Sequence, residues 1–205
     1  NAFYKGFNNR KMNSFDVVYK LDADLSLPKD YLEKINSKMI NNTDIGICGG
    51  ICTVNGKIEG LTNLDHVRGA IKAYREKCFN EIGGLVHYMG WDTVDEHHAR
   101  FLGWKVSVID TLKVEHHRKT NYEFGFFRAA YKNGKMLFSI RMGFFLLLIN
   151  CLKWSLRFPF FILGLFLFSG YIVAFFSNEN KIVSTELGKF IRKYRFNKMK
   201  EKIWG

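Results

Sequence analysis

The sequence has few proline and acidic residues and no cysteine pattern. Only 2 of its 205 residues are Pro, while hydrophobic residues make up 47% and aromatic residues 16%, a composition that excludes an intrinsically disordered chain. The four cysteines form no C-x-x-C pair and no disulfide-like framework, so we expect reduced cytosolic thiols packed as small apolar groups. Acidic residues number 19 against 31 basic ones, which leaves a formal net charge of +12.

The basic surplus is concentrated towards the C-terminal end. Residues 151–205 contain ten Lys or Arg and three Glu, a net charge of +7, beside a very apolar stretch. This combination favours anionic lipid headgroups over nucleic acid as the partner. The sequence also begins at Asn1, with neither Met nor a signal-peptide pattern, and we expect it to be a fragment of a longer protein.

The most informative stretch is residues 15–26, which read F-D-V-V-Y-K-L-D-A-D-L-S. Its Val and Tyr residues favour a strand that ends at two carboxylates, Asp22 and Asp24. Side chains two positions apart share one face of a strand, and in open α/β sheets this end of a strand faces the ligand crevice. Because Mg²⁺ and Mn²⁺ prefer oxygen ligands, the pattern predicts either a divalent-metal site or two solvated carboxylates.

Apolar spacing predicts a helix after this strand and then a hairpin. The helix is expected to begin at Pro28, because apolar residues recur at helical spacing from Leu32 to Met39. Residues 45–53 look like a strand, and the Asn55-Gly56 dipeptide that follows is a hairpin signal.

The next elements are predicted in the same way. An amphipathic helix is expected over residues 64–78, on the spacing of Leu64, Val67, Ile71 and Tyr74. A short helix is expected over 92–102, closed by Gly103. Residues 104–109 alternate like a strand, and 112–114 form a second short strand candidate.

The character of the sequence changes from Tyr122 onwards. Residues 143–149 are apolar, and residues 158–176 contain no charge over 19 positions. As a helix, the second run would extend about 28 Å, close to the ~30 Å hydrocarbon thickness of a bilayer. It can span the membrane, lie in the interface or form a dry core helix. Residues 187–194 combine an apolar stripe with basic residues, which indicates a helix on a cytoplasmic membrane face or a solvated surface helix.

Two further groups of residues are suited to chemistry. Asp92 lies at the start of the predicted helix that also contains Asp95 and Glu96. A carboxylate in the first turn of a helix can accept a proton from a bound hydroxyl, or it can simply stabilise the helix. His116 and Arg118 follow the last predicted strand. Neutral imidazole ligates metals and guanidinium binds phosphate, although a His-His pair is also common in surfaces and cores. Together with the carboxylates, these groups suit a nucleotide diphosphate and its metal.

Four motifs in this order and at this spacing resemble those of the family 2 glycosyltransferases, whose domain has the GT-A fold. They are L-D-A-D followed by L-P-K-D-Y (21–31), the segment from Arg68-Gly69-Ala70 to Gly83-Gly84-Leu85, Asp92 eleven positions before Gly103, and His116-x-Arg118. The resemblance implies an α/β, Rossmann-like mixed sheet with helices. It implies that residues 1–121 are the C-terminal part of this domain, the first strands preceding Asn1. Residues 122–205 would be a tail of apolar, membrane-associated helices, as in membrane-associated bacterial members.

The resemblance also implies a role for each site residue. Asp24 would be a ligand of Mg²⁺ or Mn²⁺, and Asp22 would contact the ribose or the metal. Asp92 would be the catalytic base, His116 a metal ligand or diphosphate contact, and Arg118 a contact of the bound donor. The implied activity is inverting transfer of a sugar from a nucleotide-sugar donor to a hydroxyl acceptor. The acceptor would be a glycan, a polysaccharide or a lipid-linked molecule, and the location the cytoplasmic face of the cell (inner) membrane.

Two other interpretations are open. A haloacid-dehalogenase-like phosphohydrolase also places D-x-D after a strand; it would use Asp22 as nucleophile and Asp92 with Asp95 as its later acidic pair. The other is a non-catalytic, membrane-anchoring module with a decayed site. That interpretation is favoured by Trp91, which stands where the glycosyltransferase family usually has Glu, unless Asp95 or Glu96 compensates.

Overall fold

The computed structural model describes residues 2–9, 14–58, 65–117 and 125–204, with residues 203 and 204 described by their backbone alone. The chain forms two compact units, Asn1–Thr120 and Asn121–Gly205, which are described separately below. Arg118, the donor contact expected from the sequence, and Leu64, the first residue of a predicted helix, lie outside the described residues.

The first unit is built on a six-stranded mixed sheet with the order β1-β5-β3-β6-β2, in which β4 pairs with β3. The long strands β3 (Ile45–Val54) and β6 (Lys105–His116) run parallel, and the other pairs are antiparallel. The remaining strands are β1 (Val17–Leu21), β2 (Leu25–Ser26), β4 (Lys57–Ile58) and β5 (Ile71–Arg75). The mixed α/β sheet expected from the sequence is therefore present.

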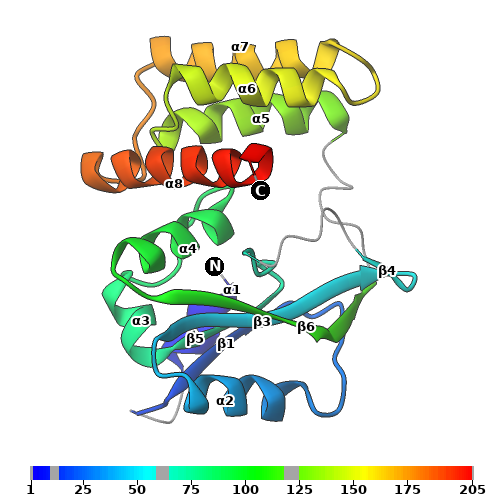
Figure 1. Ribbon diagram of the computed structural model, residues 1–205, viewed down its shortest axis with the longest axis vertical. Coiled ribbons are helices and arrows are strands. Elements are labelled where there is room, and N and C mark those ends of the chain that lie inside the picture. The colour runs from blue at the N-terminus through cyan, green and yellow to red at the C-terminus, as the bar shows by residue number, and fades with distance from the viewer. Residues whose placement is uncertain (1, 10–13, 59–64, 118–124, 205) are drawn as a thin grey trace. The chain divides into compact units, whose positions relative to one another are not determined.

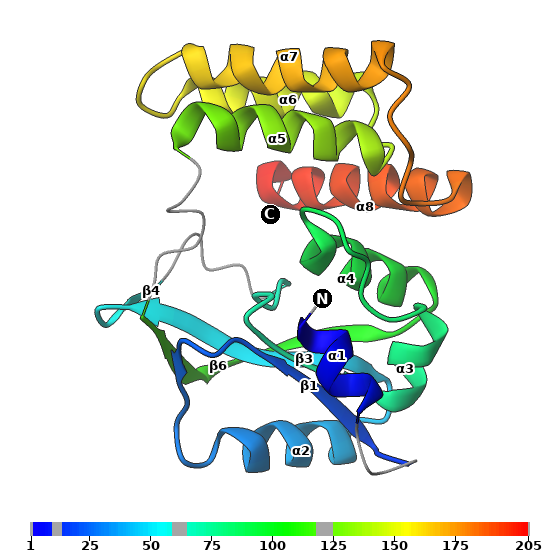
Figure 2. The ribbon, with the colours of Figure 1, turned by 180° about the vertical axis from the view of Figure 1, so that it is seen from behind.

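Helices cover both faces of this sheet. Figures 1 and 2 show α2 (Tyr31–Asn41) on one face and α4 (Trp91–Phe101) on the other. Two shorter helices, α1 (Ala2–Asn8) and α3 (Glu76–Glu81), add aromatic side chains to the core, where Phe7 packs on Phe79. The predicted helices after Pro28 and over 92–102 are confirmed, and so is the hairpin at Asn55-Gly56.

The helix predicted over 64–78 is wrong in its central part. Residues 71–75 form strand β5, in the interior of the sheet between β1 and β3, and only residues 76–81 are helical. Ile71, Lys72, Ala73 and Tyr74 are all buried, so this strand has no polar face. A strand buried on both faces loses the alternation by which strands are recognised, and its apolar residues then matched a helical spacing by chance.

The two strand candidates at 104–109 and 112–114 are one strand. Between them the register of β6 against β3 shifts, from Gly49 opposite Val108 to Ile51 opposite Lys113. This irregularity accommodates the exposed residues Asp110 and Thr111, which lie between the two candidates. Extra residues of this kind kink a strand without ending it.

The second unit consists of α5 (Phe126–Ser139), α6 (Phe144–Ser155), α7 (Ile162–Phe176) and α8 (Thr185–Trp204). Helices α5 and α7 approach closely at glycines: a Cβ on Gly134 would lie 1.9 Å from the carbonyl oxygen of Leu167, and one on Gly170 would lie 2.0 Å from that of Tyr131. Small residues are needed wherever two helix backbones come this near.

The uncharged run 158–176 is not a single helix. Helix α7 begins only at Ile162 and has 15 residues, because the chain turns at Phe158-Pro159, and proline removes a backbone donor and restricts the residue before it. Among the described residues, we find no helix with the length and apolar character needed to cross a membrane.

Candidate functional site

The D-x-D carboxylates lie in the three-residue connection between β1 and β2. Main-chain hydrogen bonds hold both ends of this connection: the Asp22 nitrogen donates to the Ala70 carbonyl at 3.0 Å, and the His117 nitrogen donates to the Asp24 carbonyl at 3.0 Å. Both ends of the connection 22–24 are thus held by main-chain groups.

Asp24 and His116 lie next to each other. Strand β2 pairs antiparallel with the end of β6, so that Leu25 is opposite His116. The Asp24 Oδ1 atom lies 3.6 Å from His116 Nε2, and the two side chains are 34% and 9% exposed. The neighbouring His117 contacts the Ser26 hydroxyl through its Nε2 atom, at 2.9 Å. His116, rather than His117, is therefore the imidazole that faces the D-x-D motif.

This pair fits a shared divalent ion by distance. Two atoms that bind one ion at bond lengths of about 2.0–2.2 Å are separated by no more than about 4 Å. Within the described ranges we find no group of three or more His, Cys, Asp or Glu side chains that would form a complete protein cage. Mg²⁺ is commonly bound by one or two carboxylates together with the phosphates of a substrate, so two protein ligands are compatible with a divalent ion.

Asp22 has a different partner from Asp24. Its carboxylate, 41% exposed, forms an ion pair with Lys20. The Lys20 ammonium in turn lies 5.1 Å from the centre of the Trp91 ring, at the start of α4. Trp91, which occupies the usual Glu position of the resembled family, therefore contacts the basic partner of the first D-x-D carboxylate.

Asp92 lies in the first turn of α4, after Gly90, whose φ of 80° is in the left-handed region that favours glycine. Its carboxylate is 29% exposed, and Oδ2 lies 3.9 Å from His66 Nε2. A Cβ on Gly69 would come within 3.0 Å of the Asp92 Cβ. Ala70, the next residue, accepts the hydrogen bond from Asp22. The segment 69–70 thus links the D-x-D connection to Asp92.

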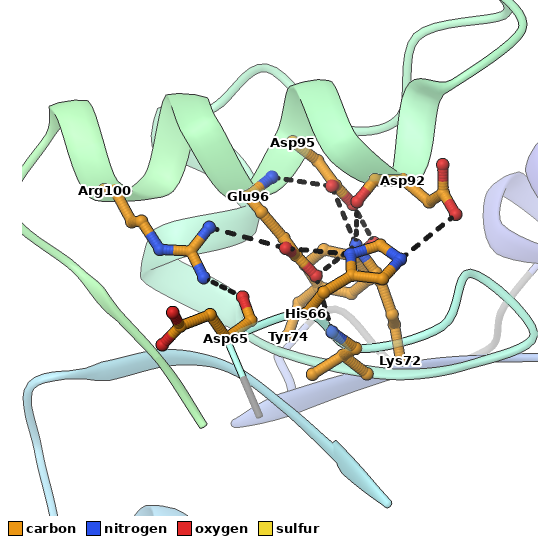
Figure 3. A network of polar contacts seen from close by, with 9 residues as sticks. Asp65, His66, Lys72, Tyr74, Asp92, Asp95, Glu96 and Arg100 are labelled. Atoms are coloured by element: carbon orange, nitrogen blue, oxygen red, sulfur yellow. Dashed lines mark hydrogen bonds and ion pairs between the residues drawn. The ribbon is translucent and has the colours of Figure 1, made fainter. Parts of the chain in front are cut away.

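Below Asp92 lies a buried charge cluster that the sequence did not reveal (Figure 3). Lys72 of β5 is fully buried; its Nζ lies 2.8 Å from Asp95 Oδ1 and 3.0 Å from Glu96 Oε1, and it donates to the Asp92 carbonyl oxygen. Tyr74, also on β5, donates to Asp95. The strand that was predicted to be helical therefore anchors the first turns of α4.

The two buried carboxylates have opposite ionisation behaviour. Burial raises the pKa of Asp95 to about 6, even though Lys72 opposes the shift. Burial acts in the same direction on Glu96, but there Lys72, His66 and Arg100 outweigh it and lower the pKa to about 2. Glu96 is consequently ionised at neutral pH. Neither carboxylate is exposed in the way Asp92 is, so neither replaces the missing family Glu as a group open to substrate.

Sequence reasoning missed Lys72 and His66. The available signal was a lysine within the apolar run I-K-A-Y, upstream of an acidic cluster on another element, because a buried lysine requires a carboxylate partner. His66 carried no signal, since its role depends on the course of the chain that brings it to α4.

Comparisons with known proteins bear on the fold. No family model and no curated protein matches the chain. The solved structures that resemble it include the mannosyltransferase PcManGT from Pyrobaculum calidifontis in complex with GDP-Man and Mn²⁺, at 11% identity and a TM-score of 0.50, covering 97% of this chain and 59% of that one. They also include GalNAc-T7 with UDP, GalNAc and Mn²⁺, at 13% identity and a TM-score of 0.46, covering 57% of this chain and 30% of that one.

The chain shares its fold with a glycosyltransferase. It spans about three fifths of the mannosyltransferase's length and 30% of that of GalNAc-T7. The similarity supports the glycosyltransferase-like α/β fold expected from the sequence motifs.

Proposed function

We propose that this chain is part of a metal-dependent glycosyltransferase of the family 2 type, which moves a sugar from a nucleotide-sugar donor to a hydroxyl acceptor with inversion. The observation that carries the proposal is the 3.6 Å separation of Asp24 Oδ1 and His116 Nε2, two residues that are 92 positions apart in the sequence. The nearby link from Asp22 through segment 69–70 to Asp92 adds a carboxylate open to solvent.

In this proposal Asp24 and His116 hold Mg²⁺ or Mn²⁺. When bound, the ion supplies neutralisation of the charge that develops on the leaving diphosphate. Asp22 contacts the ribose or the metal, and Arg118, outside the described residues, contacts the donor diphosphate. A guanidinium suits that role because its planar set of donors matches phosphate oxygens.

Asp92 is the proposed base. It accepts the proton of the acceptor hydroxyl while the hydroxyl oxygen attacks the anomeric carbon, and the bond from that carbon to the diphosphate breaks. One displacement inverts the anomeric configuration, through an oxocarbenium-like transition state as in glycoside hydrolysis. The exposure of Asp92 favours it over Asp95, whose carboxylate is fully buried against Lys72.

The test is an assay of the intact protein against a panel of sugar nucleotides, with and without Mn²⁺. We expect metal-dependent release of nucleoside diphosphate, loss of transfer with retained donor binding in Asp92→Asn, and loss of Mn²⁺ binding in Asp24→Asn. Asp110→Asn, an exposed acid on β6, is the matched control and should behave as wild type. Release of inorganic phosphate instead would identify a phosphohydrolase, and absence of any metal binding would identify a non-catalytic module.

We further propose that the second unit binds an anionic lipid surface, at the cytoplasmic face of the inner membrane, where a glycan, polysaccharide or lipid-linked acceptor would be presented. Large apolar side chains on and between α6 and α7 are exposed, among them Leu152 at 66%, Phe161 at 73% and Phe176 at 80%. Basic residues dominate the same part of the sequence, and together these features suit insertion between charged headgroups.

Flotation with phosphatidylglycerol vesicles tests this surface. The protein should float with anionic vesicles and much less with phosphatidylcholine vesicles, and Leu152→Glu together with Phe161→Glu should abolish flotation. Leu32→Glu, at an exposed leucine of the first unit, is the matched control. Equal binding of the doubly substituted protein would contradict the proposed surface.

A further inference from the structure

His66 lies between two carboxylates on successive turns of α4. Its Nδ1 atom is 3.1 Å from Glu96 Oε2, and its Nε2 atom is 3.9 Å from Asp92 Oδ2 (Figure 3). Asp92 and Glu96 are four positions apart, so both project from the same side of the helix. The imidazole thus bridges an exposed carboxylate and a buried one.

The partners of Glu96 decide which nitrogen of His66 carries the hydrogen. Glu96 Oε1 accepts from the Val67 nitrogen at 2.8 Å and lies 3.0 Å from Lys72 Nζ, while Oε2 lies 3.4 Å from the Arg100 guanidinium. A carboxylate with these partners is ionised, and an ionised carboxylate only accepts hydrogen bonds. His66 Nδ1 must therefore donate to Glu96. The neutral ring then has its lone pair on Nε2, the atom that faces Asp92.

Access to solvent is confined to one side of this array. The Glu96 side chain is 3% exposed, whereas those of His66 and Asp92 are 28% and 29% exposed. The charged groups around it are Lys72 on β5, Arg100 on α4 and Asp65, whose carbonyl oxygen accepts from Arg100. The partly exposed His66 side chain can therefore exchange a proton with water, whereas the buried Glu96 carboxylate cannot.

We propose that Glu96, His66 and Asp92 form a proton relay in which His66 receives the acceptor proton from Asp92. This inference rests on the proposed function for its substrate, and it adds a positioning residue to that mechanism. After Asp92 has accepted the proton, its O–H bond breaks as an N–H bond forms at His66 Nε2, and the imidazolium is stabilised by ionised Glu96. Release of that proton to solvent restores the neutral ring and the Asp92 carboxylate. Transfer across the 3.9 Å separation requires a side-chain rotation or one bridging water molecule.

The arrangement explains why the buried acid is at Glu96. A carboxylate there fixes the ring orientation and favours the charged imidazole, the two tasks that an acid behind a histidine performs in other enzymes. Lys72 keeps Glu96 ionised and at the same time donates to the Asp92 carbonyl oxygen, so one ammonium holds both ends of the relay.

Two measurements on the intact protein test the relay, and the first does not require turnover. Long-range ¹H–¹⁵N NMR of the histidine rings should show the Nδ1–H tautomer for neutral His66. Glu96→Leu, which removes the acceptor, should lose that pattern, and Asp92→Asn should shift the Nε2 resonance with Nδ1–H retained. An Nε2–H tautomer, or an Nε2 resonance indifferent to Asp92→Asn, would overturn the inference even if the protein proved to have no transferase activity.

The second measurement is transfer by His66→Asn, whose amide can still donate to Glu96 but has no basic nitrogen towards Asp92. We expect kcat to fall by about tenfold or more, part of the roughly 10²–10⁴ supplied by general acid–base catalysis, with KM for the donor unchanged. Added imidazole should restore part of the rate in His66→Gly. His87→Asn, at an exposed histidine, is the matched control. Wild-type kcat in His66→Asn would refute the relay but leave Asp92 as base untouched.

Discussion

Substitution of Lys72 by Met should destabilise the first unit strongly. The change keeps most of the side-chain volume but removes the one ammonium that contacts both Asp95 and Glu96. Removing one partner of a buried ion pair costs about 3–5 kcal/mol, because an uncompensated charge is left in the interior. Here two carboxylates lose the same partner, and we expect a value towards the upper end. For chains of this size the loss corresponds to a fall in melting midpoint of roughly 6–20 °C.

Urea unfolding measures the effect, with fluorescence restricted to the first unit by a Trp154→Phe/Trp204→Phe background. The free energy of unfolding should fall with little change in the dependence on urea. Lys77→Met is the matched control: Lys77 is an exposed lysine, 4.0 Å from Glu81, and its loss should cost less than about 1 kcal/mol.

A double-mutant cycle sharpens this prediction. Asp95→Asn neutralises one of the two carboxylates that lose their partner in Lys72→Met. The double variant should therefore lose less free energy of unfolding than the sum of the losses in the two single variants. A cost below about 1 kcal/mol for Lys72→Met, or strict additivity in the cycle, would refute the view that the lysine compensates two buried charges.

Three further predictions concern stability. The folded-state pKa of Asp95 is raised to about 6, so the free energy of unfolding should increase as the pH falls from 7 towards about 4. The folded-state pKa of Glu96 is lowered to about 2, so the free energy of unfolding should decrease below about pH 4. Glu96→Gln should remove this loss at acid pH in a series of urea unfolding curves. Gly134→Ala should cost about 1–3 kcal/mol in the second unit, since the added methyl would lie 1.9 Å from the Leu167 carbonyl oxygen, and thermal unfolding followed by circular dichroism will measure it. Arg75→Met should loosen the end of α2, because Arg75 donates to three main-chain carbonyls between Met39 and Ile45, and amide hydrogen exchange there should accelerate.

Local signals in the sequence were sufficient to predict the elements that have one buried and one exposed face or a characteristic turn. Helix α4 was predicted because Gly103 closes it, and the β3–β4 hairpin because Asn55-Gly56 suits the tight turn. Strand β5 was not recognised, since all but its last residue are buried. Its sequence therefore lacks the alternation of buried and exposed residues by which a strand is recognised. The burial of its lysine is explained only by the acids of α4, about twenty positions later.

The candidate site also contains residues that the sequence predicted and residues that it did not. The order of the D-x-D pair, Asp92 and His116 was enough to suggest that they meet, and the structure places Asp24 beside His116. The supporting groups depend on contacts between segments that no spacing rule connects: His66 reaches α4 from a loop, and Lys72 reaches it from the sheet. Such contacts follow from the tertiary fold and not from a local pattern.

The main-chain bonds at Asp22 and Asp24 have an evolutionary consequence. Because main-chain hydrogen bonds hold both ends of this connection, we expect exchange of either acid for its amide to leave the chain folded. A single nucleotide change turns an Asp codon into one for Asn. If Asp22 and Asp24 act as proposed, descendants of this protein can lose catalysis in one step yet keep their fold, available for selection on whatever else the remaining surfaces bind.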